Sequence, residues 1–390
     1  MGTVCITHGV YLRSGDRVSK KQIAVNLLWL RTGQVGGSQE YLIRQLMGMS
    51  LNEKAKNDYQ ITLFVQKGFV RHHPELAKIY KCVEAPAHRG ARLARIALEQ
   101  TWLAIKTRKF DAIHHGGGTM PRFGLQNTIL TMHDVQYLSF PENFSRIRLA
   151  YLRNVVPRSL HRATVITTPS SYVRDRLISE FNLSIKKVRV VRHGVDPAIV
   201  KDSTSEAELR RRFRLEFKKV IFLPAITHPH KNHKFLLQLM KLHWTDKDLV
   251  LVCAGGKGRA EEEFMREVRR LNLDDRVMRM GRVSDSDRDG LMKLSLALVF
   301  PSLYEGFGAP VIEAMILGTP VITSNCASLP EVVGDAGLVL PLELDAWSSA
   351  LQIVEAQREK LVAAGKLRAT QYSIQNSGND LIDAYSAGVR

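Results

Sequence analysis

Residues 304–315 read YEGFGAPVIEAM, with two glutamates eight positions apart on either side of a glycine turn. Gly306 and Gly308 let the backbone approach a ligand closely, because neither carries a Cβ. Pro310 suits the first position of a helix, where no N–H donor is needed. The amides at a helix N-terminus favour a phosphate, and Glu313 is expected in the first helical turn. The stretch indicates a loop-to-helix turn of an α/β protein that holds a diphosphate; taken alone, it fits a purely structural capped turn equally well.

Short apolar runs alternate with longer amphipathic runs along the chain, which is the pattern of βαβ units on parallel sheets. In the first half we expect strands at residues 22–28, 59–65, 112–114, 128–132, 164–167 and 188–191, and helices at 38–49, 91–106, 147–160 and 171–180. In the second half we expect strands at residues 220–224, 249–254, 277–280, 297–300 and 321–323, and helices at 233–242, 260–271, 287–294, 310–317 and 346–363. This order predicts an α/β fold with two Rossmann-like doubly wound domains that face a central cleft.

A length of 390 residues is too great for one ordinary core. We place an N-terminal domain at residues 1–198, with a loosely ordered lead-in at 1–20, and a second domain at 199–370. Residues 371–390 are expected to form a separate C-terminal helix. No segment has the apolar length of a membrane span or of a signal peptide core. The four cysteines lack disulfide or metal spacing, which favours a cytoplasmic location.

The net charge of +18 is distributed unevenly. Residues 1–198 hold 30 lysines and arginines against 13 acidic residues, a balance of +17, whereas residues 199–390 hold 26 against 25. Such asymmetry indicates that the first half faces an anionic partner. An anionic membrane on its cytoplasmic face, a lipid-linked acceptor and nucleic acid are the alternatives, beside a merely solubilising surface. No aromatic-basic RNA motif or recognition helix is present, which argues against nucleic acid.

Further candidate residues follow strand-like runs. Gly36 and Gly37 precede an expected helix, where main-chain amides reach a diphosphate unless the turn is only structural. Lys231 lies between an expected strand and helix, where its charge could neutralise a leaving diphosphate, although a solvated surface lysine is the commoner role. The adjacent His114 and His115 do not form a metal pair, because neighbouring residues of a strand point to opposite faces. We therefore expect no metal site.

Two more positions lie at expected strand ends. His133 follows residues 128–132, and a lone histidine there is more often a structural, hydrogen-bonded imidazole than a catalytic group. Gly255 and Gly256 follow residues 249–254 but lack the Walker phosphate-binding pattern. They are weak candidates for a phosphate contact.

The run at residues 299–340 resembles the donor-site signature of glycosyltransferase family 4. These are retaining enzymes of the GT-B fold, whose hallmark is a glutamate, seven residues and a second glutamate. The resemblance implies that Glu313 holds the ribose hydroxyls of a nucleotide sugar and that Glu305 and the Phe307 and Gly308 amides hold the sugar. The donor-binding residues it implies are Gly36, Gly37, Gly255, Gly256, Gly306, Phe307, Gly308 and Glu313. The catalytic residues it implies are His133, Lys231 and Glu305. A motif at residues 372–374 resembles the family element that precedes a last helix crossing back to the first domain.

The chain departs from the family pattern at one place. The family has an arginine a few residues before the lysine, whereas residues 226–228 read Ile-Thr-His. The sequence leaves open whether His228 or His230 takes the place of that arginine.

The resemblance implies a metal-independent, retaining hexosyltransferase. It would transfer a mannose- or glucose-type sugar from a GDP- or UDP-sugar, with no other cofactor, to a hydroxyl acceptor. A lipid-linked or cell-envelope glycan would fit the basic first half, as would peripheral membrane association. A catalytically silent GT-B scaffold and a basic nucleic-acid-binding protein are the other readings. A phosphorylase on this fold would need a pyridoxal-binding lysine and a longer chain.

Overall fold

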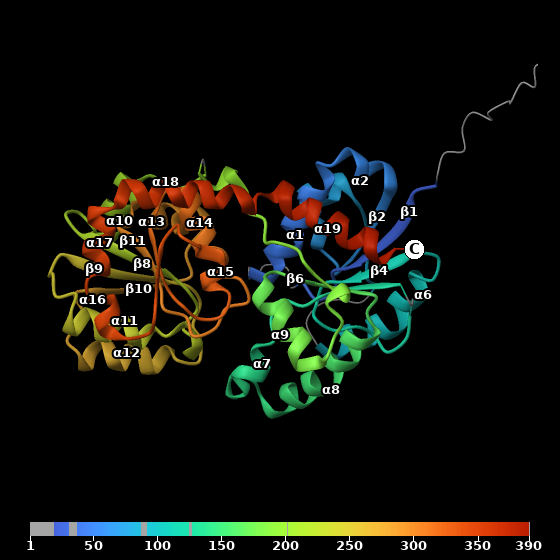
Figure 1. Cartoon of the computed structure of the whole chain (residues 1–390), viewed down its shortest axis with the longest axis horizontal. Helices are drawn as coiled ribbons and strands as arrows, with labels where there is room; N and C mark the ends of the chain where they lie inside the picture. The colour runs from blue at the N-terminus through green and yellow to red at the C-terminus, as the bar shows by residue number, and fades with distance from the viewer. Residues whose placement is uncertain (1–18, 31–36, 87–91, 125–126, 201, 390) are drawn as a thin grey trace, which may run out of the picture.

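The computed structural model describes residues 19–30, 37–86, 92–124, 127–200 and 202–389, which form two parallel α/β sheets. Each sheet lies between layers of helices, and the two units stand side by side (Figure 1). The predicted fold class is confirmed. The expected lead-in falls almost wholly on residues 1–18, outside the described part of the chain.

The first sheet has seven strands in the order β3-β2-β1-β4-β5-β6-β7. Its strands are β1 (Lys21–Asn26), β2 (Tyr59–Val65), β3 (Lys81–Glu84), β4 (Ala112–His115), β5 (Thr128–Thr131), β6 (Val165–Thr168) and β7 (Val188–Val190). Its helices are α1 (Gly37–Ser50), α2 (Glu53–Asp58), α3 (Phe69–His72), α4 (Pro74–Ile79), α5 (Arg92–Leu98), the π-helical η1 (Glu99–Leu103), α6 (Ala104–Lys106), α7 (Gln136–Ser139), α8 (Arg146–Arg162) and α9 (Ser171–Phe181).

The second sheet has six strands in the order β10-β9-β8-β11-β12-β13. Its strands are β8 (Lys219–Pro224), β9 (Leu249–Ala254), β10 (Val277–Gly281), β11 (Ala297–Phe300), β12 (Val321–Ser324) and β13 (Leu338–Leu340). Its helices are α10 (Glu206–Phe213), α11 (His233–Leu242), α12 (Glu261–Arg270), α13 (Asp285–Leu294), α14 (Ala309–Leu317), α15 (Leu329–Val333), α16 (Leu344–Ser348), α17 (Ala350–Ala356) and α18 (Arg358–Ala369), and α19 (Ile374–Gly388) ends the chain. Short 3₁₀ turns lie at η2 (Pro141–Asn143), η3 (Ile185–Lys187), η4 (Pro197–Val200), η5 (Pro229–Lys231) and η6 (Thr370–Tyr372).

Both sheets reverse their strand order at the centre, and this positions the ligand site. In the second sheet β8 pairs with β9 on one side and with β11 on the other. The connections leaving β8 and β11 therefore depart to opposite sides, and ligands of such sheets bind beyond the carboxyl ends of the strands at this point. The loops after these two strands carry Lys231 and Glu305.

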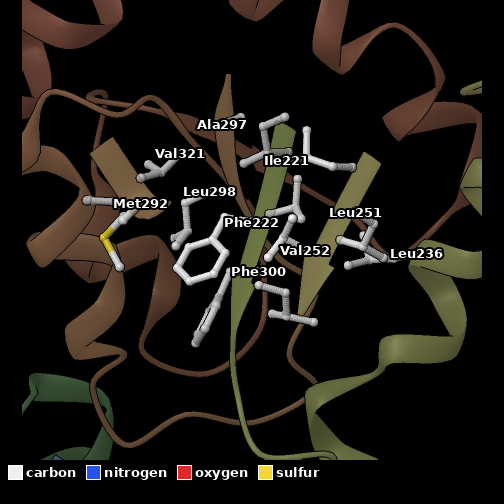
Figure 2. Close-up of a cluster of buried hydrophobic side chains, with 14 of the residues drawn as sticks. Ile221, Phe222, Leu236, Leu251, Val252, Met292, Ala297, Leu298, Phe300 and Val321 are labelled. Atoms are coloured by element: carbon white, nitrogen blue, oxygen red, sulfur yellow. The ribbon is translucent and has the colours of Figure 1, made fainter. Parts of the chain in front are cut away.

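Strands β9 and β11 of the second unit are apolar along their whole length, which made them visible in the sequence. Every residue of β9 and β11 is buried, since helices cover both faces of the sheet. Figure 2 shows apolar side chains of β8, β9 and β11 packed together, including Phe222, Val252 and Leu298. These buried strands hold in place the loops that follow their carboxyl ends.

The last helix, α19, packs against α1 of the first unit rather than on the second sheet (Figure 1). Leu381, Ile382 and Tyr385 are buried in the core that also contains Leu42 of α1. The two helix backbones touch, because a Cβ built on Gly378 would lie 2.2 Å from the carbonyl carbon of Gly48. Glycine at these crossing points permits the close approach.

Several expected element bounds were wrong. The edge strands β3 and β13 were not predicted, because they are three or four residues long and largely half-buried. The helix expected at residues 346–363 is instead divided among α16, α17 and α18, and Gln357, with φ −115° and ψ 19°, separates the last two. The helix expected at 91–106 contains the π-helical turn η1, which hydropathy periodicity does not reveal.

Candidate functional site

The two central loops of the second sheet bring Lys231 and Glu305 together. Lys231 ends the turn η5 after β8, and Glu305 lies in the loop after β11. The Lys231 Nζ lies 2.5 Å from the Glu305 Oε1, and the two side chains are only 18% and 11% exposed. The lysine is therefore held beyond the ends of β8 and β11 by a carboxylate 74 positions away in the sequence, rather than extending into solvent.

Ser328 holds the backbone of the loop that carries Glu305. The Ser328 hydroxyl lies 3.0 Å from the carbonyl oxygens of both Glu305 and Phe307. Gly308 follows with φ +92°, a conformation that favours glycine, and it is the N-cap of α14 without a side-chain cap. No hydrogen bond joins the Phe307 or Gly308 amide to another residue in the described part of the chain. Among the described residues, therefore, nothing occupies these two N–H groups, which suit an anion or a sugar oxygen.

Glu313 differs in position from the prediction. Helix α14 begins at Ala309, so Glu313 is its fifth residue and lies in the second turn rather than the first. The helix starts one residue earlier than expected, because Gly308 supplies the cap and Pro310 takes the second helical position. The charged form of Glu313 is therefore stabilised by neighbouring cations rather than by the N-terminus of the helix.

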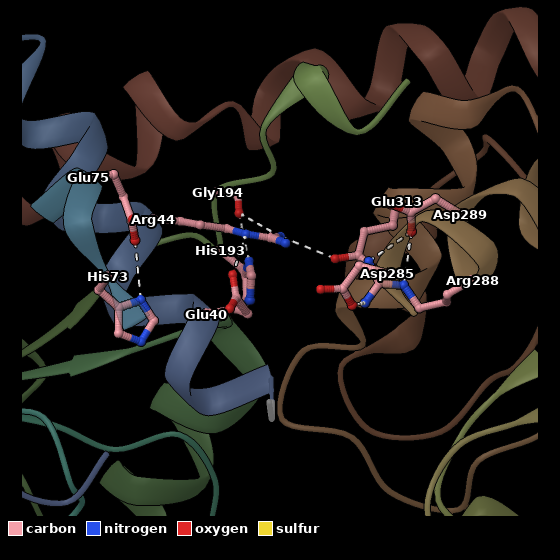
Figure 3. Close-up of polar contacts among 10 residues, drawn as sticks. All are labelled: Glu40, Arg44, His73, Glu75, His193, Gly194, Asp285, Arg288, Asp289 and Glu313. Atoms are coloured by element: carbon pink, nitrogen blue, oxygen red, sulfur yellow. Dashed lines mark hydrogen bonds and ion pairs between the residues drawn. The ribbon is translucent and has the colours of Figure 1, made fainter. Parts of the chain in front are cut away.

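Glu313 is buried between two arginines from different units (Figure 3). The Arg44 Nη1 of α1 lies 3.2 Å from its Oε1 and also donates to the Gly194 carbonyl at 3.4 Å. Burial by itself raises the pKa of Glu313, but Arg44 and Arg288 outweigh it and hold that pKa below the usual range. Glu313 is therefore a carboxylate at neutral pH, and Arg44 bridges the two units.

His193 lies beside this pair, on the connection between the two sheets. Its ring stacks on that of Phe307 with centroids 5.2 Å apart and planes inclined by 13°. Burial, with Arg44 nearby, lowers the pKa of His193 to about 4, so the ring is neutral. The stack holds the Phe307 ring against the connection between the two sheets.

His133 and Gly306 meet across the boundary between the units. A Cβ on Gly306 would lie 2.3 Å from the His133 carbonyl oxygen, so only glycine fits. The half-buried His133 ring contacts Gly116 through its Nε2, 2.8 Å from the carbonyl oxygen. Because a carbonyl only accepts, Nε2 carries the proton and Nδ1 remains an acceptor. Burial lowers the pKa of His133, which favours this neutral form.

Other contacts hold the same loop against the first unit. The Ser170 hydroxyl donates to the Gly306 carbonyl at 2.7 Å, and the Val135 amide donates to the Tyr304 hydroxyl at 3.1 Å. The Glu331 carboxylate of α15 accepts from two amides at the start of α9, at 2.8 and 3.0 Å. A carboxylate is favoured at that positive helix end.

The remaining predicted glycines have different outcomes. Gly37 begins α1 as expected, whereas Gly36 lies outside the described residues. The Gly255 amide donates to the Gly281 carbonyl at 2.7 Å, so it is not free for a phosphate. The Gly256 carbonyl accepts from Arg279 at 3.0 Å. A donor contact at this turn stays a prediction.

Several site residues were missed by sequence reasoning. They are Arg44, His193, Ser170, Glu331 and Tyr304, whose hydroxyl accepts a hydrogen bond from the first unit. Only Arg44 left a local signal, since it lies one helical turn after Glu40 and pairs with it at 3.3 Å. In the described part of the chain no group of three metal-ligating side chains occurs, and metal independence stays a prediction. No helix among those residues is long and apolar enough to cross a membrane.

Comparison with known proteins identifies the family. Residues 205–368 match the model described as glycosyl transferases group 1, and residues 51–199 match that of glycosyltransferase family 4. The chain is 30% identical over 324 residues to the O-antigen chain mannosyltransferase B of Escherichia coli, covering 81% of each protein. The chain belongs to glycosyltransferase family 4. This glycosyltransferase is also 31% identical over 264 residues to the O-antigen chain mannosyltransferase RfbU of Salmonella typhimurium, covering 65% of the chain and 69% of that protein.

Solved structures agree on the fold of the glycosyltransferase. Anabaena HepE in complex with UDP-glucose superposes with a TM-score of 0.70 at 16% identity, over 94% of this chain and 99% of that one. WaaG, a glycosyltransferase involved in lipopolysaccharide biosynthesis, gives 0.68 at 14% identity, over 94% and 99%. At these identities the likeness concerns architecture alone.

Proposed function

We propose that this glycosyltransferase transfers a hexose, mannose in the first instance, from a nucleoside-diphosphate sugar to a hydroxyl of a cell-envelope glycan, with retention of configuration. The observation that carries the proposal is the Lys231–Glu305 pair beside the unpaired Phe307 and Gly308 amides. A cation and two free N–H groups on neighbouring loops suit a phosphate, and a carboxylate at the same place suits sugar hydroxyls. The mannosyltransferases named above support mannose as the sugar.

Each residue has a distinct task in this proposal. Lys231 stabilises the charge that develops on the departing diphosphate, while Glu305 and the amides orient the hexose. His133 keeps its Nδ1 as an acceptor toward the sugar from the first unit. Glu313 receives the ribose hydroxyls when Arg44 moves aside, so donor entry is coupled to separation of the two units.

The acceptor side is proposed from charge. Helix α8 carries Arg146, Arg148, Arg153 and Arg158, and its Ile147 is 85% exposed. An exposed apolar residue among arginines suits an anionic membrane surface, at roughly 1 kcal/mol for each basic residue near the lipid. We propose peripheral binding to anionic lipid, where a lipid-linked acceptor would be met. Flotation with vesicles containing or lacking anionic lipid tests this, and equal recovery in both would remove it.

The donor site is tested by binding. UDP, GDP and their sugars are titrated while the melting temperature of the full chain is followed. We expect one nucleotide class to stabilise the wild type, and Glu313→Ala to lose that response. Glu343→Ala is the matched control, because Glu343 is an exposed glutamate of the same unit.

The outcomes separate the alternatives. No response to any nucleotide sugar would favour a catalytically silent scaffold, and a steep salt-dependent gel shift would favour a nucleic-acid binder. Normal turnover by both Glu305→Ala and Glu313→Ala would contradict the assigned site.

A further inference from the structure

We propose that His228 and His230 act together as a proton-accepting part of the diphosphate site, so that binding of the nucleoside diphosphate takes up a proton. This inference rests on the proposed function and concerns the place where the family arginine is missing. It assigns a positioning and charge-supplying role to two residues on either side of Pro229, next to Lys231.

The geometry brings the two rings together beside Lys231. The His228 and His230 rings stack with centroids 5.7 Å apart and planes inclined by 20°. His230 is 9% exposed, and its Nδ1 has no hydrogen-bond partner within the described part of the chain. The His230 carbonyl accepts from the Leu303 amide at 2.7 Å, which ties the turn to the Glu305 loop. A buried, unpaired ring nitrogen costs free energy unless a ligand satisfies it.

The positively charged side chains near the two rings already have hydrogen-bond partners. Lys231 is already neutralised by Glu305, and the nearby Arg279 guanidinium is bound to Glu261 at 3.0 Å. Lys231 and Arg279 therefore each face a carboxylate. Arg259, whose charge also acts on His228, donates to the Glu142 carbonyl at 2.9 Å. The imidazoles are groups beside Lys231 that can gain charge when an anion arrives.

Both rings are neutral in the surroundings that the structure gives them. Burial, together with the neighbouring Lys231, His228 and His233, lowers the pKa of His230 to about 3. Burial also lowers the pKa of His228, with Lys231 and Arg259 adding to the effect. His233 is likewise neutral, since burial lowers its pKa to about 3, with Arg279 and Lys231 adding to the decrease and Glu261 opposing it.

A bound diphosphate reverses this balance. Its negative charge favours the protonated ring, so the pKa of the stacked pair rises on binding. The bound state then holds more protons than the free state, and affinity must fall as pH rises, by at most about tenfold per pH unit for one proton. A single proton shared by the two rings adds the positive charge that the arginine would have supplied.

The test is calorimetric titration of the full chain with UDP and with GDP in two buffers of different ionisation enthalpy. The difference in measured heat gives the number of protons taken up. We expect net uptake by the wild type between about pH 5.0 and 6.5, because an opposite charge nearby raises a lowered histidine pKa by about 1–3 units. His230→Gln and His228→Gln each keep a hydrogen-bonding side chain without the titration, and each should reduce the uptake and weaken binding by roughly 10- to 100-fold. His230→Arg should bind with little proton uptake, because its charge is permanent.

Controls separate this inference from the proposed function. His243→Gln, a half-buried histidine on the far end of α11, should bind and take up protons as the wild type does. Melting curves of all variants report folding. Tight nucleotide binding with no proton uptake, or with uptake unchanged in both variants, would overturn the inference alone. No binding of either nucleotide would instead reject the diphosphate site itself.

Discussion

Replacing Arg44 by methionine tests the contact that bridges the two units. The variant keeps the apolar stem of the side chain and removes the guanidinium 3.2 Å from Glu313. Breaking a buried pair leaves an uncompensated charge and costs about 3–5 kcal/mol. Arg288 remains and still favours the Glu313 carboxylate, which offsets part of this cost. We therefore expect a loss of about 2–3 kcal/mol, below that range.

The pH dependence of the free energy of unfolding tests the same contact independently. The folded-state pKa of Glu313 is lowered, so its contribution to stability is present above the unfolded pKa of about 4.3 and is lost as pH falls through the folded pKa. Without Arg44, burial raises the pKa of Glu313. The deficit of Arg44→Met should then be full at pH 7.5 and smaller at pH 5.0, where the carboxyl takes up a proton.

Scanning calorimetry at the two pH values measures the effect. A loss of 2–3 kcal/mol corresponds to a decrease of roughly 4–12 °C in the melting temperature of a domain of this size. Arg44→Met combined with Glu313→Gln should be less destabilised than the sum of the single changes, because the second change removes the stranded charge. Arg270→Met, which removes an exposed arginine paired with Glu267, is the control and should melt like the wild type. Equal melting of the Arg44 and Arg270 variants, or strict additivity, would refute the reasoning.

Three further changes follow from the close contacts. Gly306→Ala places a Cβ 2.3 Å from the His133 carbonyl, and we expect slower turnover with near-normal melting, because the units must part to relieve the clash. Gly378→Ala places a Cβ 2.2 Å from the carbonyl carbon of Gly48, and overpacking should cost about 3 kcal/mol in thermal unfolding. Lys231→Ala should lower kcat by roughly 10²–10³ in a donor-turnover assay, as removal of a charge-stabilising group does elsewhere. An unchanged kcat would exclude Lys231 from the reaction.

Local sequence patterns predicted the fold class and the glycine turn with a glutamate on either side. The apolar runs of β8, β9 and β11 and the glycine turn before α14 predicted parallel strands with ligand-binding loops after them. These signals are local, because strand burial and helix capping depend on residues a few positions apart. Glu305 lies in that glycine turn, whereas the roles of Glu305 and Lys231 were named from the resemblance to glycosyltransferase family 4.

Tertiary structure alone decided which groups those residues meet. Arg44 and Glu313 are separated by 269 positions, and the Lys231–Glu305 pair by 74. No periodicity of the sequence encodes such separations. The Arg44–Glu313 contact arises where the two units meet, and the Lys231–Glu305 contact arises where the loops after the paired strands β8 and β11 lie side by side. Glu313 thus became a buried anion between arginines rather than a helix-end carboxylate, and His193 became the support of Phe307. The sequence placed the chemical groups along the chain, and packing of the two units determined their charge states and partners.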